Sequence, residues 1–268
     1  FNKKLKVEHK EYIELNQIYP NPTWVEQDPI ELIDKIEILL DRIIKKNSNK
    51  NIISIGITNQ RESVVVWNKK TGKPIYNTIV WQCRRTKKYC QSLKTKERLV
   101  FDKTGLYLDS YFSATKIKWI LENIKESKKL LQEDLLLCGT IDTWIVWNLT
   151  KRSKHLTDYT NASRTLLYNI NNQEWDDELL DLFNIPKKIL PNVKKSIDDF
   201  GKHDKYNIPI NAVAGDQQAA LFGHGCVQKN SSKCTYGTGL FFLLNTGKKR
   251  IDSKNNLLTT LAVGEDGN

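Results

Sequence analysis

Short apolar runs separated by amphipathic stretches predict an α/β chain. Four runs are typical of strands, at 52–57, 64–67, 135–138 and 208–213. Run 208–213 in particular is typical of a short buried strand. Strands that alternate with helical segments indicate βαβ units, in which a helix connects two parallel strands, so we expect an α/β fold.

The clearest predicted helix begins after Asp28. Asp28 is a favourable N-cap, Pro29 suits the first helical position, and Glu31 stands where a capping box has its acidic residue. We expect this helix to continue to about Lys46, because apolar side chains recur on one face. That face comprises Ile33, Ile36, Leu40, Ile43 and Ile44.

Weaker signals complete the outline. Residues 1–14 alternate loosely between apolar and polar, which favours the second strand of a hairpin whose first strand is expected to be missing from this chain. Residues 69–73 are expected to form a turn around Gly72. A helix is predicted over 142–149, entered through Gly139.

The composition is that of a folded chain. The 268 residues are 39% hydrophobic and include seven Trp, which is enough for a substantial core. No apolar run approaches the ~20 residues of a membrane span, and no signal peptide is recognised. Five cysteines without C-x-x-C spacing disfavour a zinc site or a disulfide framework, so a reducing cytoplasm is expected. Because the chain has no Met, we expect it to be part of a longer protein.

The formal net charge of +11 brings nucleic-acid binding into consideration. Lys is spread along the whole chain, however, and no nucleic-acid-binding motif accompanies it. A basic nucleic-acid-binding module is kept only as an alternative. The charge is instead expected to help attract an anionic substrate.

The polar run Ala214-Gly215-Asp216-Gln217-Gln218 stands at the exit of strand 208–213. Ligands of open α/β sheets bind at the carboxyl ends of strands, so Asp216 is a candidate general base. The alternative is a local role, in which Asp216 caps a helix over 219–222.

Two more polar segments stand out. Strand 52–57 is followed by Asn59-Gln60-Arg61-Glu62, which offers donors and acceptors to a polyhydroxy ligand or forms a surface ion pair. The segment Tyr236-Gly237-Thr238-Gly239 allows backbone N–H groups to approach a phosphate, although a plain hairpin turn has a similar sequence.

Taken in order, these segments resemble the glycerol kinases of the FGGY carbohydrate kinase family, over essentially the whole chain. The most specific matches are Asn59-Gln60-Arg61-Glu62 and Trp81-Gln82-Cys83-Arg84-Arg85, and further matches cover 111–116, 158–165 and 215–223. The resemblance implies an actin-like, ribonuclease H-like ATPase fold. It also implies an FGGY N-terminal domain over 1–224 and the start of the C-terminal domain over 225–268.

The resemblance further implies a reaction, the ATP-dependent phosphorylation of glycerol to sn-glycerol 3-phosphate in glycerol catabolism. Asp216 is implied to be the general base. The implied glycerol ligands are Arg61, Glu62, Tyr111, Asp216 and Gln217, and the implied aromatic walls are Trp81 and Phe241. Thr238, with Gly237 and Gly239, is implied to bind the nucleotide phosphates.

The chain also departs from the FGGY pattern. A first phosphate loop, and an Asp expected to help hold Mg²⁺, would precede Phe1, and the adenine-binding elements would follow Asn268. We therefore expect the chain alone to be inactive, within a parent enzyme that uses ATP and Mg²⁺ and forms a homodimer or homotetramer. Another FGGY sugar or polyol kinase is the alternative, but it would lack the Asn59-Gln60-Arg61-Glu62 motif together with Trp81.

Overall fold

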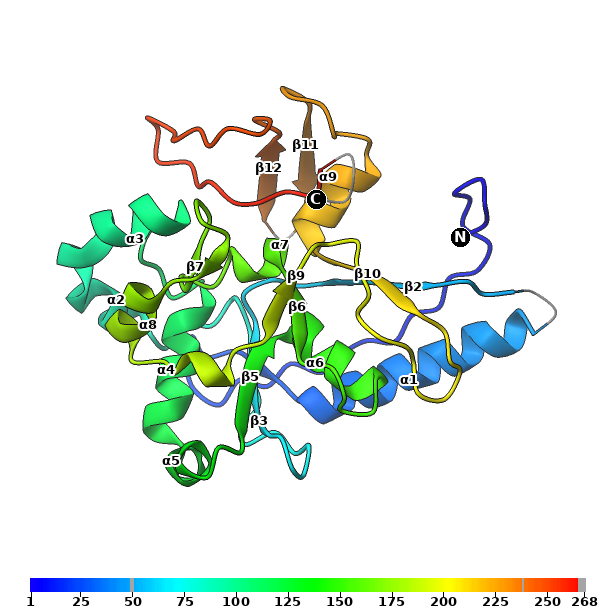
Figure 1. Ribbon diagram of the computed structural model, residues 1–268, viewed down its shortest axis with the longest axis horizontal. Coiled ribbons are helices and arrows are strands. Elements are labelled where there is room, and N and C mark those ends of the chain that lie inside the picture. The colour runs from blue at the N-terminus through cyan, green and yellow to red at the C-terminus, as the bar shows by residue number, and fades with distance from the viewer. Residues whose placement is uncertain (49–50, 238, 265–268) are drawn as a thin grey trace.

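The computed structural model of the chain describes residues 1–48, 51–237 and 239–264 and has a mixed α/β architecture (Figure 1). Its largest sheet has the strand order β1–β4–β3–β5, and all neighbouring strands in it are antiparallel. These strands are β1 (Glu26–Gln27), β3 (Val64–Asn68), β4 (Thr78–Ile79) and β5 (Leu136–Thr140). The predicted strands 64–67 and 135–138 are therefore confirmed, but they pair antiparallel and not as a βαβ unit.

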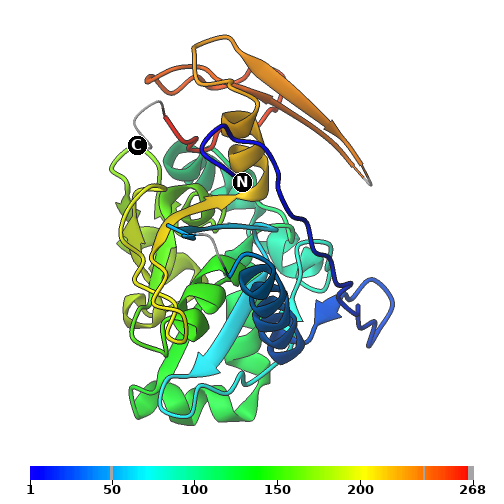
Figure 2. The ribbon, with the colours of Figure 1, turned by 90° about the vertical axis from the view of Figure 1, so that its right-hand side faces the viewer.

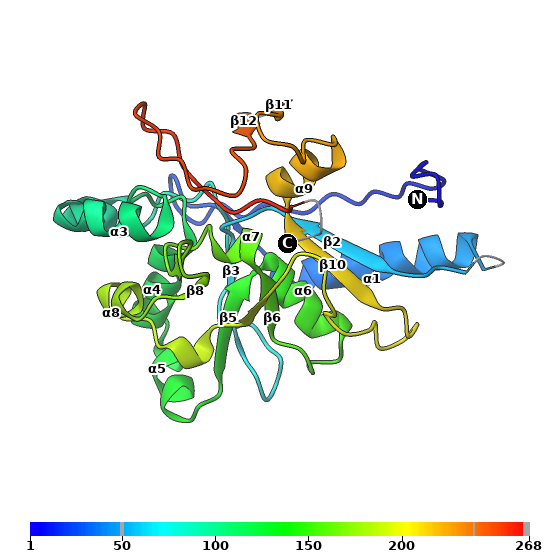
Figure 3. The ribbon, with the colours of Figure 1, turned by 45° about the horizontal axis from the view of Figure 1, so that its top comes forward.

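Parallel pairing occurs in two smaller sheets. One contains β2 (Ile55–Asn59) and β10 (Ile210–Gly215), which lie side by side below α9 (Figure 3). The other contains β6 (Leu156–Asp158) and β9 (Asn192–Lys194). Two antiparallel pairs complete the strands: β7 (Tyr168–Asn169) with β8 (Glu174–Trp175), and β11 (Ser232–Tyr236) with β12 (Leu240–Leu244).

The helices flank the central strands. In Figure 1, α4, α5 and α8 lie on the left of β3 and β5, whereas α1 and α6 lie on their right. The α-helices are α1 (Pro29–Lys46), α2 (Lys87–Ser92), α3 (Glu97–Thr104), α4 (Ser113–Asn123), α5 (Lys125–Gln132), α6 (Ile141–Leu149), α7 (Tyr159–Ala162), α8 (Asp177–Phe183) and α9 (Asp216–Gly223). Two 3₁₀ turns cover Lys94–Lys96 and Lys187–Ile189.

Strand β3 is buried on both faces because a separate apolar core packs on each. Val64 and Val66 face a core that includes side chains of α4, α5 and α8. Val65 and Trp67 face a second core, built largely from α1 and α6. All four side chains are fully buried, as expected for a strand covered on both sides. This double packing fixes the position of the segment that immediately precedes β3.

Helix α1 confirms the prediction made from its capping signal and apolar face. The side chain of Asp28 accepts a hydrogen bond from the backbone N–H of Ile30 at 2.8 Å. Glu31 does not complete a capping box, because its carboxylate binds Lys35 and Asn16 instead. Side chains from the predicted face pack against the second core.

One strand prediction stays untested and another was wrong in part. Residues 1–14 pair with no described segment, and the strand expected to pair with them is not in this chain. Strand 52–57 begins only at Ile55, and Ile53 is 69% exposed. Of the described strands, only β10 pairs with β2, so β2 is half-buried with alternate residues facing outward. Strand 208–213 is confirmed as β10, shifted by two residues.

The other local predictions are confirmed. Helix 142–149 corresponds to α6, and residues 69–71 form a turn, after which Gly72 adopts a φ of +69°. All five cysteines are free thiols. Among the described residues, no helix is long and apolar enough to cross a membrane.

Candidate active site

Asp216 is the first residue of α9, directly after β10, and its side chain does not cap the helix. Its Oδ1 lies 3.0 Å from Nε of Arg61, although the N–H is not aligned for a hydrogen bond. The contact is therefore an ion pair. The Asp216 side chain as a whole is 42% exposed, whereas its Oδ1 atom is buried. The capping alternative is not what the structure shows, since the N-cap is Gly215.

Arg61 is buried across the end of β10, with only 5% of its side chain exposed. Its Nη1 donates a hydrogen bond to Oε1 of Gln218 at 3.1 Å. Burial opposes the charge of Arg61, but the carboxylates of Glu62 and Asp216 outweigh this effect and raise its pKa. The interpretation of Arg61 and Glu62 as a surface ion pair is therefore wrong.

Gly215 allows Arg61 to cross the strand end. A Cβ atom on Gly215 would lie 2.6 Å from both Cγ and Cδ of Arg61, which is closer than carbon atoms pack. The absence of a side chain at this position thus sets the place of the guanidinium beside Asp216.

We predict that Gly215→Ala in the full-length protein raises the KM for a polyhydroxy ligand expected at Arg61 by roughly tenfold or more, because overpacking displaces Arg61. Gly223→Ala is the control at the other end of α9, where an added Cβ meets no atom within 4 Å. Steady-state kinetics of both variants checks the prediction. Equal KM values for the two variants would contradict it.

Glu62 lies between two arginines. Its Oε1 accepts a hydrogen bond from Nε of Arg164 at 2.6 Å and lies 3.8 Å from Nε of Arg61. Only 1% of its side chain is exposed, and its φ of +62° is unusual for a residue other than glycine. The sequence reasoning gave Arg164 no role, because its partner is remote in the chain and only the fold brings the two together.

Three aromatic rings gather beside these charges. The ring of Trp81 lies 5.7 Å from that of Tyr111 and 6.4 Å from that of Phe241, both edge-on. Arg164 stands over Tyr111 at 5.7 Å. Burial, reinforced by the Glu62 carboxylate, raises the pKa of Tyr111, so its hydroxyl stays protonated at neutral pH. The predicted aromatic walls thus lie next to the predicted polar ligands.

Gln217 extends the cluster toward the β11–β12 hairpin. Its Nε2 donates to Oδ2 of Asp216 at 3.1 Å, and its Oε1 accepts from Nζ of Lys233. Lys233, which sequence reasoning missed, also donates to Oγ1 of Thr235 at 2.7 Å. The amide of Gln217 is thereby held with its N–H groups toward Asp216.

The β11–β12 hairpin stands above α9, at the top of Figures 1 and 2. Gly237 and Gly239 lie between its strands, with N–H of Gly237 donating to the carbonyl of Gly239 at 3.1 Å. The hairpin-turn interpretation of this segment is therefore correct as local structure. Thr238 lies outside the described residues, and a phosphate-binding role for this turn stays a prediction.

A buried polar network of α7 and β6 side chains holds the end of β10 through hydrogen bonds. The backbone N–H of Gly215 donates to Oγ1 of Thr160 at 2.9 Å, and that hydroxyl donates to Oδ2 of Asp158 at 2.6 Å. Asp142 lies in the same interior, where burial and the nearby Asp158 raise its pKa to about 7. The network positions backbone and does not face solvent, so we assign it no chemical step.

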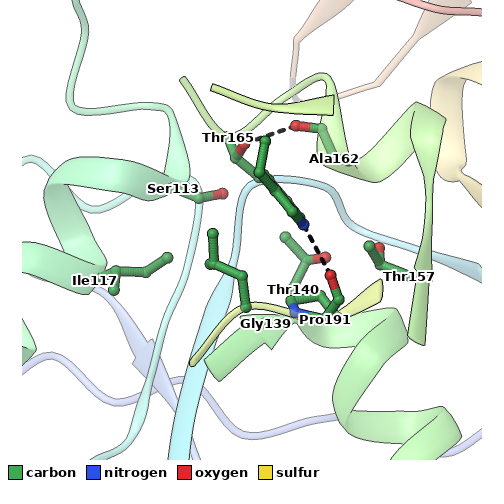
Figure 4. Close-up of a pocket in the computed structure, with 10 residues that line it drawn as sticks. Ser113, Ile117, Gly139, Thr140, Thr157, Ala162, Thr165 and Pro191 are labelled. Carbon is green, nitrogen blue, oxygen red and sulfur yellow. Dashed lines mark hydrogen bonds between the residues drawn. The ribbon is translucent and has the colours of Figure 1, made fainter. Parts of the chain in front are cut away.

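A small internal cavity lies near this network (Figure 4). Its volume is about 10 Å³, and Ser113, Thr140, Thr157 and Pro191 are among its lining residues. It has room for about one water molecule and is too small for glycerol. None of the predicted substrate ligands lines it. In the described parts of the chain, no group of three His, Cys, Asp or Glu residues is placed to hold a metal ion.

Comparison with known proteins shows the family to which the chain belongs. Residues 1–223 match the N-terminal domain of the FGGY family of carbohydrate kinases. The chain belongs to this family. It is 54% identical over its whole length to a glycerol kinase of Clostridium botulinum (strain Langeland), and 52% identical over 95% of its length to a glycerol kinase of Fusobacterium nucleatum. The chain covers 55% of the Clostridium protein and 53% of the Fusobacterium protein. It therefore spans about half the length of the curated relatives it matches.

Solved structures confirm the fold. Plasmodium falciparum glycerol kinase with ADP superposes with a TM-score of 0.94 and 38% identity, covering 99% of this chain and 55% of that protein. A xylulose kinase from Brucella ovis superposes with a TM-score of 0.76 at 19% identity, covering 85% of this chain and 47% of that protein, and so supports the fold alone. The FGGY chain described here therefore has the actin-like kinase fold predicted from its sequence.

Proposed function

We propose that the protein carrying this chain transfers a phosphoryl group from ATP to glycerol and forms sn-glycerol 3-phosphate. The observation that carries this proposal is the meeting of a polar cluster with an aromatic one. Arg61, Glu62, Asp216 and Gln217 lie on one side, and Trp81, Tyr111 and Phe241 lie on the other. Three hydroxyl groups on a short carbon chain require this combination of partners.

Asp216 is proposed to act as the general base that accepts the proton of the attacking hydroxyl. Its side chain is partly exposed, and its carboxylate is oriented by Arg61 on one oxygen and by Gln217 on the other. Phosphoryl transfer depends mainly on positioning and charge stabilisation, so a fixed carboxylate at the hydroxyl is a suitable base.

Arg61 and Glu62 are proposed to bind the remaining hydroxyl groups as donor and acceptor. Tyr111 adds a hydroxyl of its own, and the rings of Trp81 and Phe241 pack against the carbon chain. A site that pairs each substrate hydroxyl discriminates against analogues that lack one, because buried partners would be left without a hydrogen bond.

The second substrate is proposed to be ATP, which binds together with Mg²⁺. Its phosphates are proposed to lie at the turn that contains Gly237 and Gly239. The ADP in the Plasmodium enzyme supports nucleotide use by the fold. We propose that residues 1–224 and 225–268 belong to two domains, as the FGGY resemblance implies. A homodimer or homotetramer, a cytoplasmic location and a role in glycerol catabolism stay predictions.

The proposal is tested by incubating the full-length protein with glycerol, ATP and Mg²⁺ and identifying the product enzymatically. We expect sn-glycerol 3-phosphate to form at a rate proportional to enzyme. Omission of glycerol provides the control for ATP hydrolysis. If glycerol is not phosphorylated while the protein is folded, the proposal is wrong.

A further inference from the structure

Lys116, in α4, is a charged residue whose side chain is fully buried. Its Nζ donates hydrogen bonds to three backbone carbonyls: those of Glu62 at 3.1 Å, Phe112 at 3.3 Å, and Tyr111. An ammonium group has three N–H donors, so each of them has an acceptor. When protonated, Lys116 therefore has a main-chain acceptor for every N–H group, and its side chain does not contact solvent.

A lysine at this position is unfavourable unless its hydrogen bonds offset its desolvation. Burial lowers the pKa of Lys116 to about 7, although the nearby Glu62 carboxylate opposes that change. An apolar side chain of similar length would fill the same space without this cost. Packing alone thus gives no reason for a lysine here.

The three carbonyls belong to the segments that carry two of the proposed glycerol ligands. Glu62 lies two residues before β3, and Tyr111 lies two residues before α4. The two segments are far apart in the sequence and are brought together by the fold. The Glu62 carbonyl also accepts a hydrogen bond from Oγ of Ser113 at 3.2 Å. Two donors on this carbonyl are consistent with the disfavoured φ of +62° at Glu62, which requires outside support.

We infer that Lys116 is a positioning residue of the acceptor site, whose ammonium group joins the backbones of Glu62 and Tyr111 so that both side chains meet the substrate. It does not touch the substrate itself. The inference rests on the proposed function, because it concerns the binding of glycerol.

The test is Lys116→Met in the full-length protein, with separate KM values for glycerol and ATP. We expect the glycerol KM to rise by roughly tenfold or more, since two ligand segments lose a charge-assisted hydrogen bond, while the ATP KM is unchanged. Lys118→Met is the matched control: Lys118 lies in the same helix, is 14% exposed, and pairs with Glu122 and the ring of Tyr89. It should change neither KM.

Lys116→Arg is the second variant, in case Lys116→Met does not fold. The planar guanidinium retains the charge but not the tetrahedral arrangement of donors, so we expect a smaller rise in glycerol KM with an unchanged ATP KM. An unchanged glycerol KM in a folded Lys116 variant would overturn the inference. So would a parallel rise of both KM values, which indicates a general structural role.

The wild-type assay separates this inference from the proposed function. If the wild-type protein does not phosphorylate glycerol, the proposed function fails and the inference fails with it. If the wild-type protein is active and the Lys116 variants bind glycerol normally, only the inference fails.

Discussion

Asp216→Asn in the full-length protein is expected to lower kcat with glycerol by about 10²–10⁴-fold, the usual contribution of a general base. Asn has nearly the same shape and retains hydrogen-bonding groups beside Arg61 and Gln217, but it cannot accept the proton of the attacking hydroxyl. The glycerol KM should change much less than kcat, because the other ligands of the site remain. Steady-state rates at saturating ATP measure both constants.

Asp177→Asn is the matched control for this variant. Asp177 is also the first residue of a helix, α8, but it is exposed and pairs with Lys187 at the surface. The same chemical change there should leave kcat at the wild-type value. A folded Asp216→Asn protein with unchanged kcat would rule out the assignment of the base.

Glu62→Gln is expected to have the second largest effect, on both stability and binding. The carboxylate of Glu62 lies between two buried guanidinium groups, those of Arg61 and Arg164. Its neutralisation leaves Arg164 without a carboxylate partner, and breaking a buried pair in this way costs about 3–5 kcal/mol. We expect the midpoint of urea unfolding, monitored by Trp fluorescence, to fall. We also expect weaker glycerol binding.

The control for Glu62→Gln is Glu133→Gln. Glu133 pairs with Lys129 on the surface of the molecule, with both side chains largely exposed. Exposed pairs contribute little, so the urea midpoint should stay at the wild-type value. If the Glu62 variant unfolds at the same urea concentration as this control, the buried carboxylate is not the centre of the charge cluster.

Local signals predicted those parts of the fold that depend on neighbouring residues. The cap at Asp28 and the repeat of apolar side chains sufficed for α1, because a helix makes its hydrogen bonds within itself. Strands depend on partners elsewhere in the chain. Residues 1–14 have a strand-like pattern without a described partner, and β2 is less buried than its isoleucines suggested.

The same distinction applies to the candidate site. Arg61, Glu62 and Asp216 could be proposed from the sequence, because each follows directly on a predicted strand or belongs to a family motif. Arg164, Lys233 and Lys116 could not be assigned in this way. Each of them has at least one partner that is remote in sequence, and a buried Lys or Arg has no local pattern that distinguishes it from an exposed one.

The most direct test of the glycerol site is a comparison of kcat/KM for glycerol and for D-xylulose, with ATP, on the full-length protein. The proposed glycerol site, in which the rings of Trp81 and Phe241 lie beside the polar ligands Arg61 and Asp216, predicts that glycerol is the preferred substrate. An equal or higher kcat/KM for D-xylulose would contradict the account and would favour another FGGY sugar kinase.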